Sequence, residues 1–261
     1  YKTIDYMDTL SIGMERRAKK APWYTRWIYH MEAARLKEYE QRIFNYFEFQ
    51  TMISQQDVHY IAHPDQRKIK VIPNGIDTDF FHPMKNPEST YDLVFVGNLS
   101  YAPNIDAMKW FATHVLRHEP QWRLLIAGAN PSSAFIQSLK KYRNIVIEGW
   151  QPDIRSAYSK GTIFIAPMQI GTGMQNKLLE AMAMGIPCVT TPLASEALDV
   201  IPGHDLLVGG NAEEFAKHIK FLLNNPTDAK IIGEHGRNTV KNTYSWESAV
   251  NTLNELIILP R

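Results

Sequence analysis

The sequence is poor in cysteine, in long apolar runs and in net charge. Its one cysteine, Cys188, excludes an internal disulfide and a cysteine zinc site and favours a reducing compartment, the cytoplasm. No apolar run approaches the ~18–20 residues that span a bilayer, and no signal peptide opens the chain. The 28 Lys and Arg nearly balance the 27 Asp and Glu, so the chain lacks the basic field that gathers nucleic acid. We expect a cytoplasmic protein without a nucleic-acid partner.

The length and composition are those of a folded protein. Hydrophobic residues make up 44% of the 261 residues and charged residues 21%, far from the depletion that marks disorder. This length allows one large domain or two modest ones. The chain opens on Tyr1 rather than Met, and its first residues resemble the interior of a fold. We therefore expect a truncated protein.

From Tyr91 onward, short runs rich in Val, Ile, Leu and Phe alternate with helical stretches. This alternation predicts a parallel sheet with helices on both faces. Most of the strands end near Gly, Ala-Pro or Thr-Pro, so the carboxyl edge of the sheet consists of tight turns, where ligands bind in open α/β sheets. The predicted strands are 91–96, 122–127, 145–147, 162–166, 188–191 and 205–208, and the predicted helices between them are 105–117, 132–141, 153–158 and 176–184.

Residues 1–67 have a different texture and predict the end of a second α/β unit. Strands are expected at 4–7 and 49–54, with one long helix over 27–48. Pro73 and the Asn74-Gly75 pair signal a turn between the two units. The expected division is a partial amino-terminal, acceptor-side domain at 1–70, a linker at 71–90, a donor-binding domain at 91–245 and a helix at 246–261 that packs back toward the amino-terminal domain.

The most informative stretch is 170–187, a strand exit with two glycines that runs into a helix. The glycines let backbone amides approach a ligand, and the helix start adds partial positive charge, so this turn suits a phosphate or diphosphate. Lys177 would neutralise the phosphate, while Glu180 on the same face would accept hydrogen bonds from sugar hydroxyls. The alternative is that Lys177 and Glu180 form a surface (i, i+3) pair and that the glycines only make the turn.

Three segments resemble retaining GT-B glycosyltransferases of family four. Residues 176–187 resemble the donor-site helix of that family, 72–81 the segment that joins its two domains, and 95–107 the first strand and turn of the carboxyl-terminal domain in a branch that makes bacterial surface or exported polysaccharides. The resemblance implies an α/β, GT-B fold with a Rossmann-like parallel sheet. It also implies transfer of a sugar, with retention, from a nucleotide-diphosphate donor to a growing glycan or lipid-linked acceptor.

The same resemblance implies roles for individual residues. Glu180 matches the second Glu of the family's Glu, seven residues, Glu motif, which holds the ribose. Thr172 stands where the first Glu is expected, and Asn98 where the family has an Arg, so neutralisation of the diphosphate rests on Lys177 and backbone amides. The implied catalytic residues are Lys177 and Glu180, and the implied donor-binding residues are Gly97, Asn98, Gly128, Trp150, Gly171, Thr172, Gly173, Met174, Gln175, Asn176, Lys177 and Glu180.

Several of these assignments keep an alternative. The backbone or ring of Trp150 would meet the base, but a lone Trp is equally often a core residue. Amides, a helix terminus and a Lys stabilise a leaving diphosphate without a metal, so we expect no obligatory metal or other cofactor. His114 and His118 lack a third ligand nearby and read as a solvated helix face. Cys188 reads as a packed thiol in a dry strand.

Residues 11–42 carry eight Lys or Arg against four Glu, with aromatic residues interleaved. Such content can seat a helix at an anionic membrane surface, which would place the protein at the inner face of the membrane. The interpretation that we favour is that the aromatics pack on a missing part of their own domain.

Two other functions remain open at this stage: a non-catalytic nucleotide-sugar-binding module, and a sugar-nucleotide epimerase of GT-B architecture. The family places acceptor groups on the amino-terminal domain, most of which is expected to be missing. The chain is therefore expected to bind donor but to be inactive without the rest of that domain.

Overall fold

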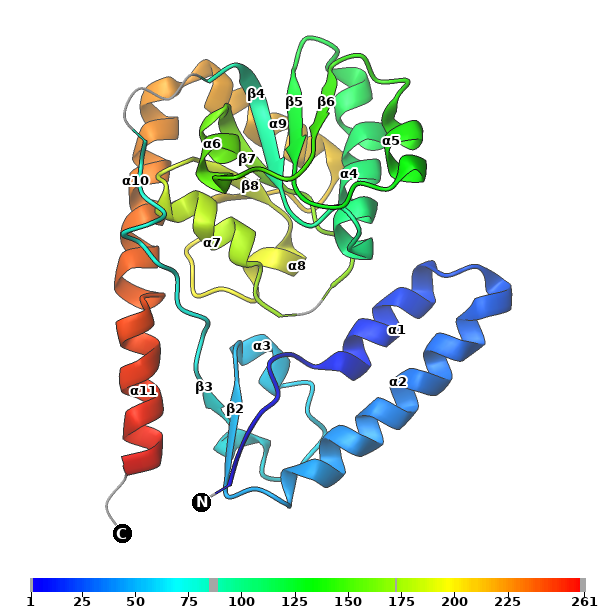
Figure 1. Ribbon diagram of the computed structural model, residues 1–261, viewed down its shortest axis with the longest axis vertical. Coiled ribbons are helices and arrows are strands. Elements are labelled where there is room, and N and C mark those ends of the chain that lie inside the picture. The colour runs from blue at the N-terminus through cyan, green and yellow to red at the C-terminus, as the bar shows by residue number, and fades with distance from the viewer. Residues whose placement is uncertain (1, 85–88, 172, 259–261) are drawn as a thin grey trace.

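The computed structural model describes residues 2–84, 89–171 and 173–258, which form two α/β units (Figure 1). The first unit comprises β1 (Thr3–Asp5), α1 (Leu10–Lys20), α2 (Trp23–Phe44), β2 (Phe49–Met52), α3 (Gln55–Val58), a 3-10 turn (Gln66–Lys68) and β3 (Lys70–Val71). Its strands form a parallel sheet in the order β1-β2-β3. Phe44, Met52 and Ile61 belong to its own small apolar core.

The second unit is a six-stranded parallel sheet. Its strands are β4 (Tyr91–Val96), β5 (Leu124–Ala127), β6 (Ile145–Glu148), β7 (Gly161–Ala166), β8 (Cys188–Thr190) and β9 (Leu207–Val208). They lie in the order β6-β5-β4-β7-β8-β9. The chain begins at the centre with β4, adds β5 and β6 toward one edge, returns to the centre with β7, and adds β8 and β9 toward the other edge. Rossmann-like sheets have this order, and their ligands bind at the point of reversal, between β4 and β7. The predicted fold is confirmed.

Helices cover both faces of this sheet (Figure 1). They are α4 (Ala102–His114), α5 (Ser133–Leu139), α6 (Ile154–Ser159), α7 (Asn176–Ala183), α8 (Pro192–Ser195), α9 (Ala212–Asn224) and α10 (Pro226–Thr243), with a 3-10 turn at Leu116–His118. Phe111 of α4 and Phe215 of α9 stack edge to face on one side. Tyr158 of α6 packs on Phe164 of β7, and Lys177 of α7 lies over Phe95 of β4. Because the Phe95 and Phe164 rings stack on each other, α6 and α7 share one face.

The long helix predicted over 27–48 is α2, which begins and ends four residues earlier, at Trp23 and Phe44. The antiparallel helix α1 precedes it, and the two meet at Ala21 and Pro22. Pro22 lacks an N–H group and disfavours helical backbone in the residue before it, so it separates the two helices. The predicted strand at 4–7 also ends early, because Met7 has a left-handed backbone (φ 61°).

Helix α4 begins three residues before its predicted start. Pro103 lies in its first turn, where a missing N–H group costs nothing because that turn has no intrahelical acceptor for it. Cys188 is fully buried, and burial raises the pKa of its thiol well above the usual range; its prediction as a packed thiol is confirmed. Among the residues that the structure describes, no helix is long and apolar enough to cross a bilayer.

The described chain crosses between the two units twice, and the two crossing segments are hydrogen-bonded to each other. The N–H group of Ile76, after β3, donates to the carbonyl oxygen of Tyr244 at 2.6 Å. Just beyond Tyr244, α11 (Trp246–Ile258) leaves the second unit and runs beside the first (Figure 1). Thr51 of β2 and Leu253 of α11 line one groove there. Gly75 packs directly on Trp246.

A side chain at Gly75 should therefore be costly. In Gly75→Ala the new Cβ would lie 2.7 Å from the backbone Cα of Trp246, so the linker or α11 must shift, and we expect the free energy of unfolding to fall by about 1–3 kcal/mol. Chemical denaturation of the variant measures this change. Gly149→Ala is the matched control, because its Cβ would meet nothing within 4 Å. Equal stability of the two variants would contradict the described packing.

Candidate functional site

Two glycine turns meet at the carboxyl ends of β4 and β5. Gly97 follows β4, and its N–H group donates to the carbonyl oxygen of Ala127 at 3.0 Å. Gly128 follows β5 with φ 147°, and a Cβ on it would lie 2.8 Å from the carbonyl carbon of Gly97. No side chain fits at Gly128, since the two backbones touch. The turns therefore present bare backbone at the reversal point of the sheet.

Lys177 lies over this glycine surface. Its Cε is 3.4 Å from the position that a Cβ on Gly97 would take, and its Nζ stands 6.0 Å from the centre of the Phe95 ring. Nζ donates to Oε1 of Gln175 at 2.7 Å. Burial lowers the pKa of Lys177 to about 8, against a smaller opposing effect of Glu180. The structure thus places a protonated but poorly solvated ammonium group at the reversal point near neutral pH.

The start of α7 adds to the positive potential. Gln175 precedes the helix without a side-chain hydrogen bond to its first turn, so backbone N–H groups and the helix dipole face the same space. The other end is closed by Gly185 (φ 71°), with bonds from Ile186 N to Ala181 O at 3.1 Å and from Gly185 N to Met182 O at 2.8 Å. This Schellman motif fixes the length of α7.

Glu180 is positioned by a residue that sequence reasoning missed. The hydroxyl of Tyr158 donates to Oε2 of Glu180 at 2.6 Å and lies 3.2 Å from the carbonyl oxygen of Lys177. Burial raises the pKa of the Glu180 carboxyl, while the Tyr158 hydrogen bond and Lys177 oppose that rise. Lys177 and Glu180 bond to different neighbours and not to each other, unlike the predicted surface pair. The sequence held no signal for Tyr158, because the contact depends on how α6 packs on α7.

The loop between β7 and α7 faces the first unit. Gly171 (φ 132°) accepts a hydrogen bond at its carbonyl oxygen from Nη1 of Arg16 on α1. Gly173 (φ 69°) packs on the carboxylate of Asp8, whose Oδ2 lies 2.9 Å from where a Cβ would stand. The predicted Thr172 lies outside the described residues. Asp8 and Arg16 therefore join the candidate site from the other unit, which no pattern in the sequence indicated.

Buried carboxylates hold the segment that carries Asp8 and Arg16. Glu40 of α2 accepts from the N–H group of Ser11 at 3.0 Å and from its hydroxyl at 2.6 Å. The N–H group of Thr9 donates to Oδ1 of the Asp57 carboxylate at 3.4 Å, and its hydroxyl donates to the backbone carbonyl oxygen of Asp57 at 2.9 Å. These bonds satisfy the start of α1 inside the first unit and set its approach to Gly173.

The polar groups of the turn after β4 hydrogen-bond mainly to one another. Asn98 accepts at Oδ1 from the hydroxyl of Ser100 at 2.8 Å, and its carbonyl oxygen accepts from Nδ2 of Asn104 at 2.9 Å. Asn104 is buried against Gly97, and its Oδ1 has no hydrogen-bond partner in the described structure. A buried acceptor of this kind is costly unless a ligand or water bonds to it. Asn104 was not predicted.

The other predicted residues spread around the same edge. Trp150 follows β6 and is 70% exposed, so its interpretation as a core residue is wrong; β5 separates β6 from β4. Met174 is buried within the loop. Asn176 is exposed at the start of α7, where its Oδ1 accepts weakly from Asn74 at 3.4 Å. The structure brings Gly97, Gly128 and Lys177 into contact and leaves Trp150 apart from them.

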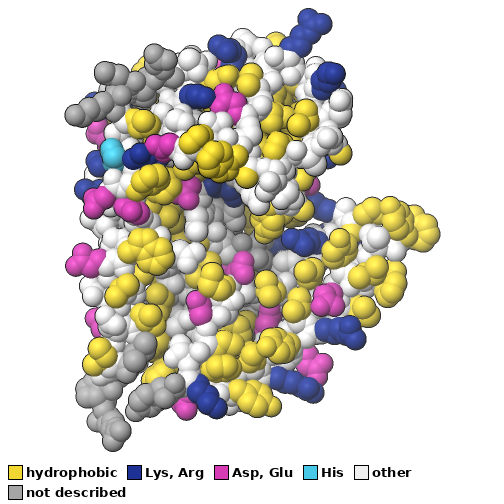
Figure 2. Space-filling model, in the orientation of Figure 1, with side chains coloured by type: hydrophobic (Ala, Val, Ile, Leu, Met, Phe, Trp, Pro, Cys, Tyr) yellow, Lys and Arg dark blue, Asp and Glu magenta, His cyan; other side chains and the backbone are white. Residues whose placement is uncertain are grey.

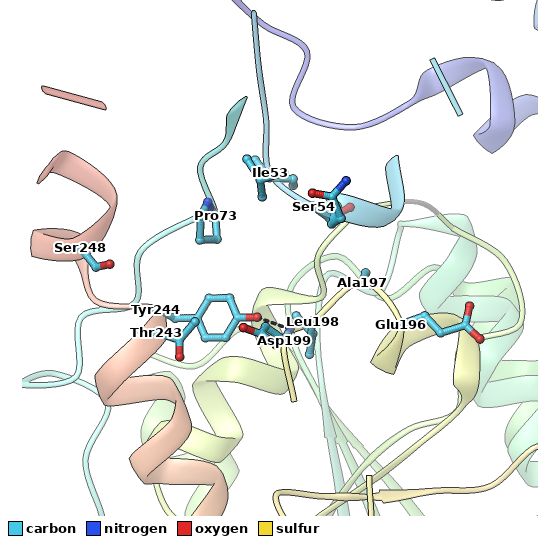
Figure 3. Close-up of a pocket in the computed structure, with 12 residues that line it drawn as sticks. Ile53, Ser54, Pro73, Glu196, Ala197, Leu198, Asp199, Thr243, Tyr244 and Ser248 are labelled. Atoms are coloured by element: carbon cyan, nitrogen blue, oxygen red, sulfur yellow. Dashed lines mark hydrogen bonds between the residues drawn. The ribbon is translucent and has the colours of Figure 1, made fainter. Parts of the chain in front are cut away.

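A separate cavity of about 420 Å³ opens between the units, beside the segment that follows α8 (Figure 3). Ile53 and Ser54 line it from the first unit, and Asp199 and Tyr244 from the second. The Tyr244 hydroxyl points at Asp199 and accepts its backbone N–H at 2.5 Å (Figure 3). Among the predicted site residues that the structure describes, none lines this cavity.

The Rossmann order, the ammonium group at its reversal point and a second α/β unit against the loop between β7 and α7 define a two-unit α/β protein. A profile described as "Glycosyl transferases group 1" matches residues 90–225. That is more than half of the chain, and the protein belongs to this family. The predicted resemblance is confirmed.

Individual relatives are distant. A 44.6 kDa protein in the cps region of Klebsiella pneumoniae is 26% identical over 174 residues, covering 62% of this chain and 45% of that protein. The UDP-Gal:alpha-D-GlcNAc-diphosphoundecaprenol alpha-1,3-galactosyltransferase of Escherichia coli is 23% identical over 223 residues, covering 74% and 55%. The structure of HepE from Anabaena in complex with UDP and glucose superimposes with a TM-score of 0.73 at 16% identity, covering 99% and 71%. The chain spans about half the length of the curated relatives it matches.

The Tyr158–Glu180 contact can be tested directly. In Tyr158→Phe the charged form of Glu180 loses its hydrogen bond, so the pKa of Glu180 should rise further and the free energy of unfolding at neutral pH should fall by about 1–3 kcal/mol. The loss should shrink in acid, where the carboxyl is protonated and the hydrogen bond is worth less. Denaturation at several pH values measures both. Tyr142→Phe, whose hydroxyl makes only a 3.4 Å contact with Thr113, should change little; an equal effect of both variants would contradict the assignment.

Proposed function

We propose that this protein transfers a sugar, with retention, from a nucleotide-diphosphate donor to a growing glycan or lipid-linked acceptor in bacterial polysaccharide biosynthesis. The observation that carries the proposal is the convergence of the Lys177 ammonium, the start of α7 and the Gly97 turn at the reversal point of the sheet. Three sources of positive potential in one place suit a diphosphate.

The diphosphate would lie along Gly97 with Lys177 above it. Negative charge grows on the nucleoside diphosphate as it leaves the sugar carbon, and donors aimed at that charge stabilise the transition state. Because Lys177 is poorly solvated already, it needs little further desolvation when the diphosphate arrives. Its loss should therefore lower turnover as well as donor affinity.

Glu180 would hold the ribose. Its Oε2 is occupied by Tyr158, and the charged carboxylate can still accept from sugar hydroxyls at Oε1. Tyr158 is buried under α7, so the carboxylate is oriented before donor binds. This preorganisation favours a defined ribose position over a general anion site.

The relatives support a polysaccharide role. The Escherichia coli relative acts on a diphosphoundecaprenol-linked sugar, and HepE was captured with UDP and glucose. Asp8 and Arg16 reach the donor-side loop from the first unit, which suits an acceptor-side domain at 1–70, a linker at 71–90, a donor domain at 91–245 and a returning helix at 246–261. Since the chain matches only about half the length of those relatives, we propose that it binds donor and needs a fuller acceptor side for turnover.

Donor binding is the direct test. UDP- and GDP-sugars should raise the melting temperature of the protein, and calorimetry should show Glu180→Ala weakening the bound sugar nucleotide by about 1–3 kcal/mol, because it removes acceptors for buried hydroxyls. Glu234→Ala, an exposed helical carboxylate on α10, is the control and should bind normally. A flat melting response to every nucleotide sugar would contradict the proposal, and release of an altered sugar nucleotide without acceptor would identify an epimerase instead.

The pH dependence of donor binding tests Lys177. The free protein loses the proton of Lys177 as the pH rises through about 8, so donor affinity should be constant below that pH and should fall above it by up to tenfold per pH unit. Lys177→Arg keeps its charge over this range, and its affinity should lose the step near pH 8. Calorimetric titrations between neutral and alkaline pH measure both proteins. An identical alkaline decline in Lys177→Arg would place the titrating group elsewhere.

A further inference from the structure

The α1–α2 hairpin projects from the first unit and ends in a cluster of hydrophobic side chains (Figures 1 and 2). We call this cluster the hairpin tip and define it as Trp23, Tyr24, Trp27 and Ile28, the first residues of α2. These side chains are 84%, 60%, 61% and 43% exposed. Large aromatic side chains are seldom left so bare in a group without a binding role.

Contacts within the hairpin tip leave its apolar surface open. The rings of Trp23 and Tyr24 meet edge to face with centres 5.9 Å apart. The indole N–H of Trp27 donates to the carbonyl oxygen of Tyr24 at 3.1 Å, so that polar group is already satisfied. What the tip presents outward is two indole rings and a phenol on a rigid helix start.

The charge around the hairpin tip has one sign. Between Arg16 and His30 the sequence has five Lys or Arg and no Asp or Glu. Two of these cations are engaged by the second unit: Arg16 bonds to Gly171, and Lys20 pairs with Asp106 at 2.7 Å. Among the described ion pairs, none involves the remaining three, which are Arg17, Lys19 and Arg26.

We propose that the hairpin tip docks on an anionic lipid bilayer. Trp and Tyr rings favour the headgroup level of a membrane, where an apolar body and a polar edge are both satisfied. Flanking Lys and Arg are drawn to the negative surface potential of anionic lipids. The most exposed apolar side chains gather in the first two turns of α2, and among the large apolar side chains further along it only Met31 and Tyr39 are exposed. The hairpin therefore meets the membrane chiefly with its end.

The surface favours lipid over nucleic acid. A single strand binds along a basic groove in which successive bases stack on aromatic rings. The hairpin tip is instead a projection (Figure 2), and the chain as a whole has a net charge of only +1. A convex aromatic end with basic flanks inserts into a soft interface more readily than it wraps a strand.

Membrane docking at the hairpin tip would also position the candidate site, because α1 connects the tip to the second unit. The helix that ends at the tip also carries Arg16, which bonds to the donor-side loop, and Lys20, which pairs with α4. A bilayer that holds the tip would thus hold the opening between the units close to the headgroups. The docking does not rest on the proposed transfer reaction, because it needs neither donor nor acceptor.

Vesicle flotation tests the proposal without any sugar nucleotide. The 261-residue chain should float with phosphatidylcholine vesicles that contain phosphatidylglycerol, bind pure phosphatidylcholine weakly, and bind less as salt is added. We expect the double variants Trp23→Ser/Trp27→Ser and Lys19→Glu/Arg26→Glu each to lose about tenfold or more in affinity. Tyr46→Ser is the matched control, because Tyr46 is 73% exposed just beyond the opposite end of α2, and it should bind like the unmodified chain. Circular dichroism and melting of each variant confirm that it is folded.

The proposal fails if the chain does not float with anionic vesicles, or if the double variants bind vesicles as tightly as the unmodified chain. A dimer in sedimentation that the Trp23→Ser/Trp27→Ser variant dissociates would assign the tip to a second copy. Tighter binding to single-stranded RNA than to vesicles would assign it to nucleic acid. A longer chain that includes residues before Tyr1 and no longer floats would likewise show that those residues cover the tip. Donor binding measured on the same variants should be unchanged, so failure here is distinguishable from failure of the proposed reaction.

Discussion

The backbone contact between Gly97 and Gly128 is the constraint on which the candidate site depends. Parallel strands end at a common edge, but side chains on the turns normally fill that edge. Here two glycines follow adjacent strands and the carbonyl of one touches the α carbon of the other. The Gly97 backbone fills the space beside Gly128, and the space beside Gly97 is shared by Asn104 and by Lys177, which enters it from α7. The ammonium group of Lys177 can therefore approach the turn because Gly97 has no side chain.

A second constraint fixes the first unit against that space. Polar groups at the start of a helix must be satisfied, and α1 meets this requirement with Glu40 from α2, while Thr9 just before it is held by Asp57. Both carboxylates are buried, so these bonds exchange little with water. The segment that carries Asp8 and Arg16 is therefore held from within its own unit, and the contacts with Gly171 and Gly173 need not hold it in place. The loop between β7 and α7 meets a surface that is already formed.

The sequence predicted the sheet well and the contacts poorly. All six strands of the second unit lie within two residues of their expected bounds, because buried parallel strands are short apolar runs between Gly and Pro signals. The first unit was harder: a polar, weakly periodic stretch hid α1, and the helix expected over 27–48 begins and ends four residues earlier, as α2. Lys177 and Gly97 could be predicted to share an edge, since topology alone brings them there. Asp8, Arg16, Asn104 and Tyr158 could not, because their contacts depend on how one element or unit packs on another.

Within the described residues, the chain crosses between the two units twice, once after β3 and once before α11. The hydrogen bond between Ile76 and Tyr244 joins these two crossings. Two crossings that are joined at one point form a pivot. Rotation of one unit against the other about this pivot moves the atoms near it little. The Arg16–Gly171 and Lys20–Asp106 contacts join α1 to the second unit away from that point, so a rotation about the linker would part both of them. Opening of the space between the units would then be a rotation about the linker, with α11 moving together with the first unit.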